Sequence, residues 1–112
     1  LVTDHDALGY LADLYGYEIA GTVIPAGTTL ASPSSADLAE LVATIDAEGV
    51  TAIFANTAEP SALAEAVATE TGADISVIPL YVGSLGAPDS PAATYIDMMR
   101  TDAQLIAQGL QG

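Results

Sequence analysis

The sequence contains no cysteine among its 112 residues. Disulfide scaffolds, thiolate zinc sites and cysteine nucleophiles are therefore excluded, and thiols say nothing about the redox compartment. Only one residue, Arg100, is a lysine or arginine, against 15 Asp and Glu, and the formal net charge is -14. Such a surface repels phosphate backbones and anionic lipid headgroups, so we expect no nucleic-acid partner and no membrane-surface partner.

Long apolar runs are also missing. None approaches the roughly 20 residues of a membrane helix, and no basic segment followed by an apolar one marks a signal peptide. The length fits one domain, and 51% hydrophobic residues supply enough apolar surface for the chain to fold despite its charge. The acidity itself has two interpretations: a solvated surface that keeps the protein in solution, or a surface that concentrates cations or is adapted to high salt.

Several catalytic and nucleotide-binding patterns are absent as well. The sequence has no G-x-S-x-G elbow and no G-x-x-x-x-G-K-[ST] loop, which disfavours hydrolase and P-loop functions. The anionic surroundings disfavour phosphate binding, so residues 26–32 are expected to form an ordinary loop rather than a phosphate-binding loop. Asp97 and Asp102 fall in a predicted helix and are expected on its solvated face, whereas Met98 and Met99 are expected to fill the core.

Helical and strand patterns alternate along the chain, as they do in proteins built around a parallel sheet. Strands are expected at residues 1–3, 18–24, 50–55 and 75–80. Helices are expected from about 5 to 16, 34 to 49 and 60 to 72, and over a long amphipathic segment that follows a loop at 82–91. The predicted fold is an α/β domain with about four parallel strands and helices on both faces of the sheet. Such sheets bind ligands beyond the carboxyl ends of their strands.

Local signals mark the ends of these helices. Thr3 or Asp4 is expected to cap the first helix, and Gly16 to end it. Ser34 and Asp37 have the spacing of a capping box. The first helix is expected to bury an apolar stripe, formed by Ala7, Leu8, Leu11, Ala12 and Leu14.

His5 is the only histidine. It lies between two aspartates, immediately after the first predicted strand. Neutral imidazole there can ligate a metal, but an exposed residue in the first turn of a helix explains the same position. One histidine cannot make a zinc site unaided, because such sites take three or four protein ligands.

The order of these features resembles a known family. The first matching stretch of this chain is TDHDALGYL at residues 3–11, closing with Tyr15 and Gly16. The second is EGVTAIF at 48–54, followed by LAE at 63–65 and ETGA at 70–73. The third is PLY at 79–81, SLG at 84–86 and TYIDMMR at 94–100. In this order they resemble the C-terminal lobe of the zinc- and manganese-binding solute-binding proteins of ABC transporters, cluster A-I. The resemblance covers essentially the whole chain.

This resemblance implies a receptor with two lobes, not an enzyme, that binds a divalent metal between its lobes and delivers it to a membrane permease. In zinc-type members the histidine that matches His5 ligates the metal, while manganese-type members carry glutamate there. The expected cargo is therefore zinc, with manganese as the second choice. The expected location is extracytoplasmic, either periplasmic or lipid-anchored on the cell surface.

Two positions depart from the family pattern. Many members have an aspartate ligand where this chain has Gly83, and a glutamate near Asn56. Either three histidines with a water or another loop group complete the site, or Asp89 reaches it from farther along the loop. Of these the first is preferred, and both departures are expected to lower the affinity for the metal.

On this resemblance, residues 1–112 are expected to be the C-terminal lobe of a longer protein, with the other ligands in an N-terminal lobe. The isolated piece should then bind zinc weakly or not at all, and it could self-associate through the cleft face. The alternative function is a small flavodoxin-like nucleotide-binding or enzymatic α/β domain. An adhesin-like surface protein of the same family is a third possibility.

Overall fold

The computed structural model describes residues 1–4, 7–24, 34–57, 62–72, 74–82 and 84–111. In this part of the chain strands and helices alternate, as the sequence predicts. The strands are β1 (Val2–Thr3), β2 (Gly21–Thr22), β3 (Ala52–Asn56) and β4 (Ser76–Leu80). The helices are α1 (Gly9–Tyr15), α2 (Ser35–Glu48), α3 (Ala62–Glu70) and α4 (Tyr95–Leu110).

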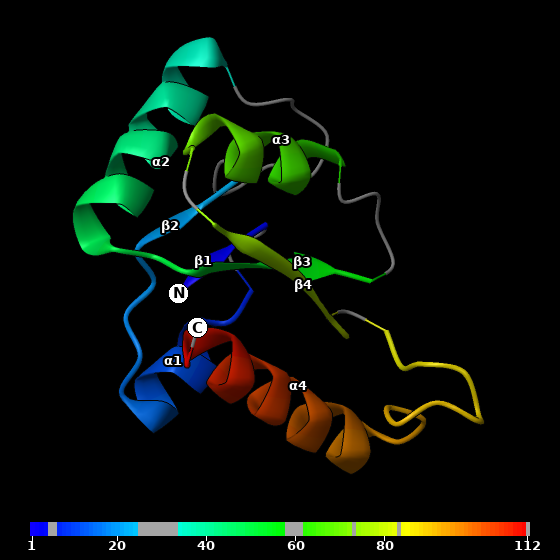
Figure 1. Cartoon of the computed structure of the whole chain (residues 1–112). Coiled ribbons are helices and arrows are strands. Elements are labelled where there is room, and N and C mark those ends of the chain that lie inside the picture. Colours follow the sequence, from blue (N-terminus) through cyan, green and yellow to red (C-terminus); the bar gives the residue numbers. More distant parts are fainter. Residues whose placement is uncertain (5–6, 25–33, 58–61, 73, 83, 112) are drawn as a thin grey trace.

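The four strands form one parallel sheet in the order β2-β1-β3-β4. Helices α2 and α3 cover one face of this sheet, and α1 and α4 cover the other (Figure 1). The predicted α/β fold, with about four parallel strands between two helical layers, is therefore confirmed. None of the helices in the described ranges is long and apolar enough to cross a membrane.

Strand β3 is buried on both sides because helices lie against each face. Its residues alternate: Ile53 and Ala55 belong to the cluster under α2 and α3, whereas Ala52 and Phe54 belong to the cluster under α1 and α4. All four are 4% exposed or less. A continuous apolar run is what burial on both faces requires, which is why the sequence predicted this strand.

Helix α2 begins and ends as predicted. The Ser34 side chain accepts a hydrogen bond from the Asp37 N–H at 3.1 Å, and the Asp37 carboxylate accepts one from the Ser34 N–H at 3.0 Å. The Ser34 N–H, and after it the Ser34 side chain, hydrogen-bond to the Asp37 carboxylate and hold the pKa of Asp37 below its usual value, because these bonds favour the ionised form. Gly49 then closes the helix with a φ of 65°, a left-handed conformation that favours glycine.

The start of α1 differs from the prediction. The helix begins at Gly9 after Leu8, and no side chain among the described residues caps it. Thr3 is instead a buried residue of β1, and the Asp4 carboxylate accepts a hydrogen bond from another strand. Neither side chain is therefore available as the expected cap. Gly16 ends α1 with a φ of 73°, as expected.

The burial of α1 and the length of β2 also differ from the predictions. Leu11 and Ala12 are buried, but Leu14 is 76% exposed, because only part of the apolar stripe faces the sheet. Strand β2 is limited to two residues of the expected 18–24, although backbone hydrogen bonds continue beside β1 at both of its ends. The loop expected at residues 26–32 and the predicted helix start at Pro60 lie outside the described residues.

Candidate functional site

The direction of the crossovers reverses between β1 and β3. From β1 the chain moves to one side to form β2, and then returns to the other side to form β3 and β4. In parallel sheets of this kind the crevice for a ligand opens beyond the carboxyl ends of the two strands at such a reversal. The residues at this position are Thr3 and Asp4 after β1, and Asn56 at the end of β3.

Asp4 is tied to the strands on both sides of β1. Its N–H donates to the Phe54 carbonyl at 3.0 Å, and its own carbonyl accepts from the Ile24 N–H at 2.9 Å. Its carboxylate Oδ2 accepts from the Asn56 N–H at 2.8 Å. Three hydrogen bonds to two neighbouring segments therefore fix the residue that immediately precedes His5 in the sequence, at the reversal point of the sheet.

Hydrogen bonds continue along this edge of the sheet toward β4. The Thr57 N–H donates to the Leu80 carbonyl at 2.9 Å, and the Tyr81 N–H donates to the Asp102 carboxylate at 2.9 Å. The carboxyl ends of β2, β1, β3 and β4 are thus joined in one row. At two points in this row, an aspartate side chain accepts a hydrogen bond from a backbone N–H at the end of a strand: Asp4 from Asn56, and Asp102 from Tyr81.

The candidate metal residues are placed to different degrees. His5 and Gly83 lie outside the described residues. Asn56 is partly buried, with its backbone N–H bound to Asp4. Asp89 is exposed in a turn in which the Ser90 N–H donates to the Ala87 carbonyl. Within the described ranges, no three His, Cys, Asp or Glu side chains form a group that could hold a metal ion.

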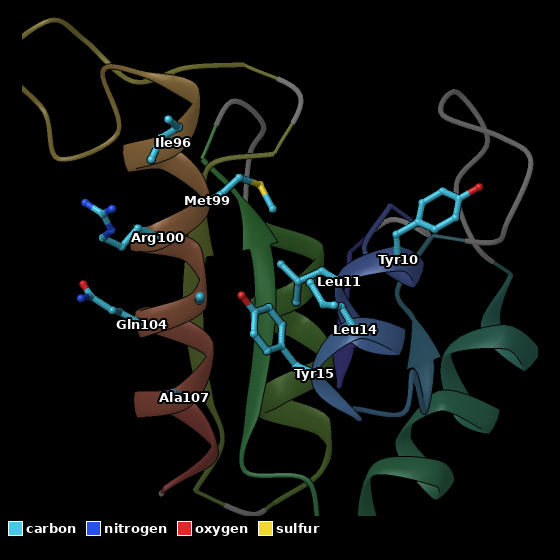
Figure 2. Close-up of a pocket in the computed structure, with 10 residues that line it drawn as sticks. Tyr10, Leu11, Leu14, Tyr15, Ile96, Met99, Arg100, Gln104 and Ala107 are labelled. Atoms are coloured by element: carbon cyan, nitrogen blue, oxygen red, sulfur yellow. The ribbon is translucent and has the colours of Figure 1, made fainter.

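A groove of about 600 Å³ lies on another surface, between α1 and α4 (Figure 2). Tyr10, Leu14 and Ile96 line it and are 97%, 76% and 67% exposed. Arg100 also lines it, 3.7 Å from Asp97. None of the described residues that line this groove is an aspartate, glutamate, histidine or cysteine, so they offer an apolar contact surface rather than metal ligands.

The two aspartates expected on a solvated face of α4 differ. Asp97 is half-exposed beside Arg100, as expected. Asp102 is only 2% exposed, so that prediction is wrong for this residue. The burial places Asp102 among the residues that face the sheet, where it follows Met99 by three positions and precedes Ile106 by four. This spacing was the signal that sequence reasoning missed.

Over residues 1–109 the chain matches the family described as zinc-uptake complex component A, periplasmic (ZnuA). The chain belongs to this family. ZnuA-family proteins are solute-binding proteins that are periplasmic or carried on the cell surface. The resemblance inferred from the sequence motifs is therefore confirmed.

Individual relatives show the same likeness. The chain is 32% identical over 98% of its length to the zinc-binding protein TroA of Treponema pallidum (strain Nichols), and it superposes on the solved structure of TroA with a TM-score of 0.87. A manganese-bound variant of a periplasmic metal-binding protein from Candidatus Liberibacter asiaticus is 30% identical over 98% of this chain, with a TM-score of 0.83. A laminin-binding adhesin of Streptococcus agalactiae is 26% identical over 97% of it, with a TM-score of 0.77.

The coverage of these relatives is partial. This ZnuA-family chain spans 36% of the length of the curated TroA protein and 40% of the chain in the TroA structure. It spans 40% of the Liberibacter protein and 39% of the adhesin. The likeness therefore runs along nearly all of this chain and along well under half of each relative.

Proposed function

We propose that residues 1–112 are the C-terminal lobe of an extracytoplasmic receptor that captures a divalent metal, zinc in the first place, and delivers it to an ABC permease. An N-terminal lobe would supply the other half of the metal site. The observation that carries this proposal is the match to the ZnuA family over residues 1–109. The partial coverage of TroA supports the division into two lobes. The same match favours a binding protein over the flavodoxin-like alternative.

His5 is the proposed metal ligand from this lobe. In its support, the residue before it, Asp4, is fixed by three hydrogen bonds where the β1 and β3 strands end, which is the edge of the sheet where a ligand crevice is expected. Imidazole suits zinc, and a single imidazole needs two or three further ligands from elsewhere. Manganese- and cadmium-bound structures of the Liberibacter relative make the choice of metal a necessary part of the test.

The direct test uses a protein that includes the companion lobe. Calorimetry should detect one site per molecule, with zinc bound more tightly than manganese. His5→Ala should weaken zinc binding by more than about 100-fold, because even outer groups that merely orient a ligand contribute 10–100-fold. Asp13→Asn, which removes an exposed carboxylate from α1, is the matched control and should leave the affinity unchanged. Unchanged zinc binding by His5→Ala would reject His5 as a ligand.

The 112-residue chain by itself provides a second test. It carries one histidine and no cysteine, so it should show no tight zinc site. One tight site per monomer would contradict the proposed division of ligands between lobes. A site shared by two chains would instead bind half an equivalent of zinc and double the mass in analytical ultracentrifugation, as the expected self-association through the cleft face predicts.

An adhesin is the second candidate, because the Streptococcus agalactiae relative is described as laminin-binding. Surface plasmon resonance against immobilised laminin, with and without bound zinc, separates the two functions. Saturable laminin binding that survives His5→Ala would favour the adhesin, whereas zinc binding without laminin binding would favour the receptor.

A further inference from the structure

The exit from β4 is held by a buried side chain of α4. The Tyr81 N–H follows the last residue of β4 and donates to Asp102 Oδ1 at 2.9 Å. On the other side of the strand, the Leu80 carbonyl accepts from the Thr57 N–H. Since β4 is an edge strand, Asp102 supplies the partner that a further strand would otherwise provide.

Thr101, the residue before Asp102, holds the end of the β4–α4 connection that leads into α4. The Thr101 hydroxyl donates to the Pro91 carbonyl at 3.0 Å. Beyond Pro91, Ala92 is fully buried, and its carbonyl accepts from the Gly86 N–H at 2.8 Å. Two consecutive residues of α4 therefore hold the connection between β4 and α4 at its first residue, Tyr81, and near its last, at Pro91.

The described part of the connection also packs on its own beginning. A Cβ atom added to Gly86 would lie 3.0 Å from the Tyr81 ring and would overlap Ser90. The Ser90 hydroxyl donates to the Ala87 carbonyl at 2.7 Å, which closes a turn. Gly86 therefore lies close to both the Tyr81 ring and the turn that contains Ser90.

The burial of Asp102 is energetically costly. Apolar side chains of the α1 and α4 layer surround this part of α4, and the removal of water raises the pKa of Asp102, while the Tyr81 N–H opposes that rise. An apolar residue of similar volume would pack there without this cost. What the carboxylate provides in return is the fixed hydrogen bond to the exit of β4.

We infer that Asp102 and Thr101 are positioning residues for the proposed metal site. They hold the connection after β4 at Tyr81 and Pro91, on either side of the loop that is expected to bring Asp89 or another group to the metal, and they do not touch the metal themselves. This inference rests on the proposed function for its metal-binding consequence. The fastening itself depends only on the fold.

Hydrogen exchange of the 112-residue chain tests the fastening. Asp102→Leu removes the acceptor and should speed exchange of the Tyr81 amide by at least about 10-fold. Asp102→Asn keeps an acceptor oxygen, so the exchange rate of the Tyr81 amide should stay within about threefold of that in the parent protein.

Thr101→Val breaks only the Pro91 contact and should speed exchange within 84–91 alone, which keeps the test decisive if Asp102→Leu does not fold. Asp97→Asn, on the exposed face of the same helix, should change neither. An unchanged Tyr81 amide in Asp102→Leu, or an unchanged 84–91 segment in Thr101→Val, would overturn the inference.

Metal affinity of the protein with its companion lobe tests the consequence. Asp102→Leu should lower zinc affinity by about 10-fold or more, with rescue by Asp102→Asn and no effect of Asp97→Asn. Faster exchange with unchanged zinc affinity would overturn the positioning role. If the parent protein bound no metal at all, the proposed function would fail together with that role, and the exchange data would still decide whether the fastening exists.

Discussion

Replacing Gly109 by alanine should destabilise the protein, even though alanine is the better helix former. Gly109 is the penultimate residue of α4 and lies directly on the sheet. A Cβ atom added there would lie 2.5 Å from Ile78 Cδ1 and 3.0 Å from two ring carbons of Phe54. Both distances are shorter than ordinary van der Waals contact, and Phe54 is only 1% exposed, so its ring has little room to move.

Two opposing terms set the magnitude. Alanine gains up to about 1 kcal/mol over glycine inside a helix, and less near a helix end. Overpacking of a dense core costs about 1–3 kcal/mol. The expected net loss is about 1 kcal/mol of unfolding free energy, which corresponds to a melting temperature lower by about 5 °C for a domain of this size.

Thermal and urea unfolding followed by circular dichroism measure this effect. Gly9→Ala in α1 is the matched control, because a Cβ atom at Gly9 meets no atom of the described residues within 4 Å. The control should be as stable as the parent protein or slightly more stable. If Gly109→Ala gained stability as Gly9→Ala does, the close seating of α4 on the sheet would be refuted.

Three further predictions concern local charge and capping. Ser34→Ala removes one half of the α2 capping box and should cost about 1 kcal/mol in urea unfolding, whereas an effect near zero would contradict the box. Burial raises the pKa of Asp102, so the folded protein gains stability as pH falls through that pKa. Asp102→Asn should therefore be more stable than the parent protein near pH 7 and should lose this advantage in acid, and an advantage independent of pH would refute the cause. If repulsion among the 15 acidic residues opposes folding, raising NaCl from about 0.02 to 0.5 M should raise the melting temperature by about 4 °C or more, and a flat or falling trend would count against it.

The parts of the fold that sequence reasoning captured are those set by local signals. The spacing of Ser34 and Asp37, and the glycine at position 49, define α2 because capping depends on residues three or four positions apart. The continuous apolar run of β3 marks burial on both faces in the same way.

The features that the sequence did not predict depend on contacts between segments that are distant along the chain. Asp4 could not be excluded as a cap without knowing that its carboxylate binds the N–H of Asn56. Ile96 and Leu14 are apolar yet exposed, because periodicity predicts a stripe but not how much of it a neighbour covers. Asp102 was assigned to solvent by its residue type, although its spacing from Met99 and Ile106 placed it toward the sheet.

Arg100 is the only lysine or arginine in the sequence, so trypsin cleavage can report local unfolding of α4. Trypsin cleaves after lysine or arginine, so this chain offers it a single bond, Arg100–Thr101, in the middle of α4. A helical backbone does not fit a protease cleft, and cleavage therefore requires α4 to unwind around the residues that fasten the β4 exit. The rate at which fragments 1–100 and 101–112 appear would measure, without any label, how often α4 unwinds around Thr101 and Asp102, which bond to Pro91 and Tyr81.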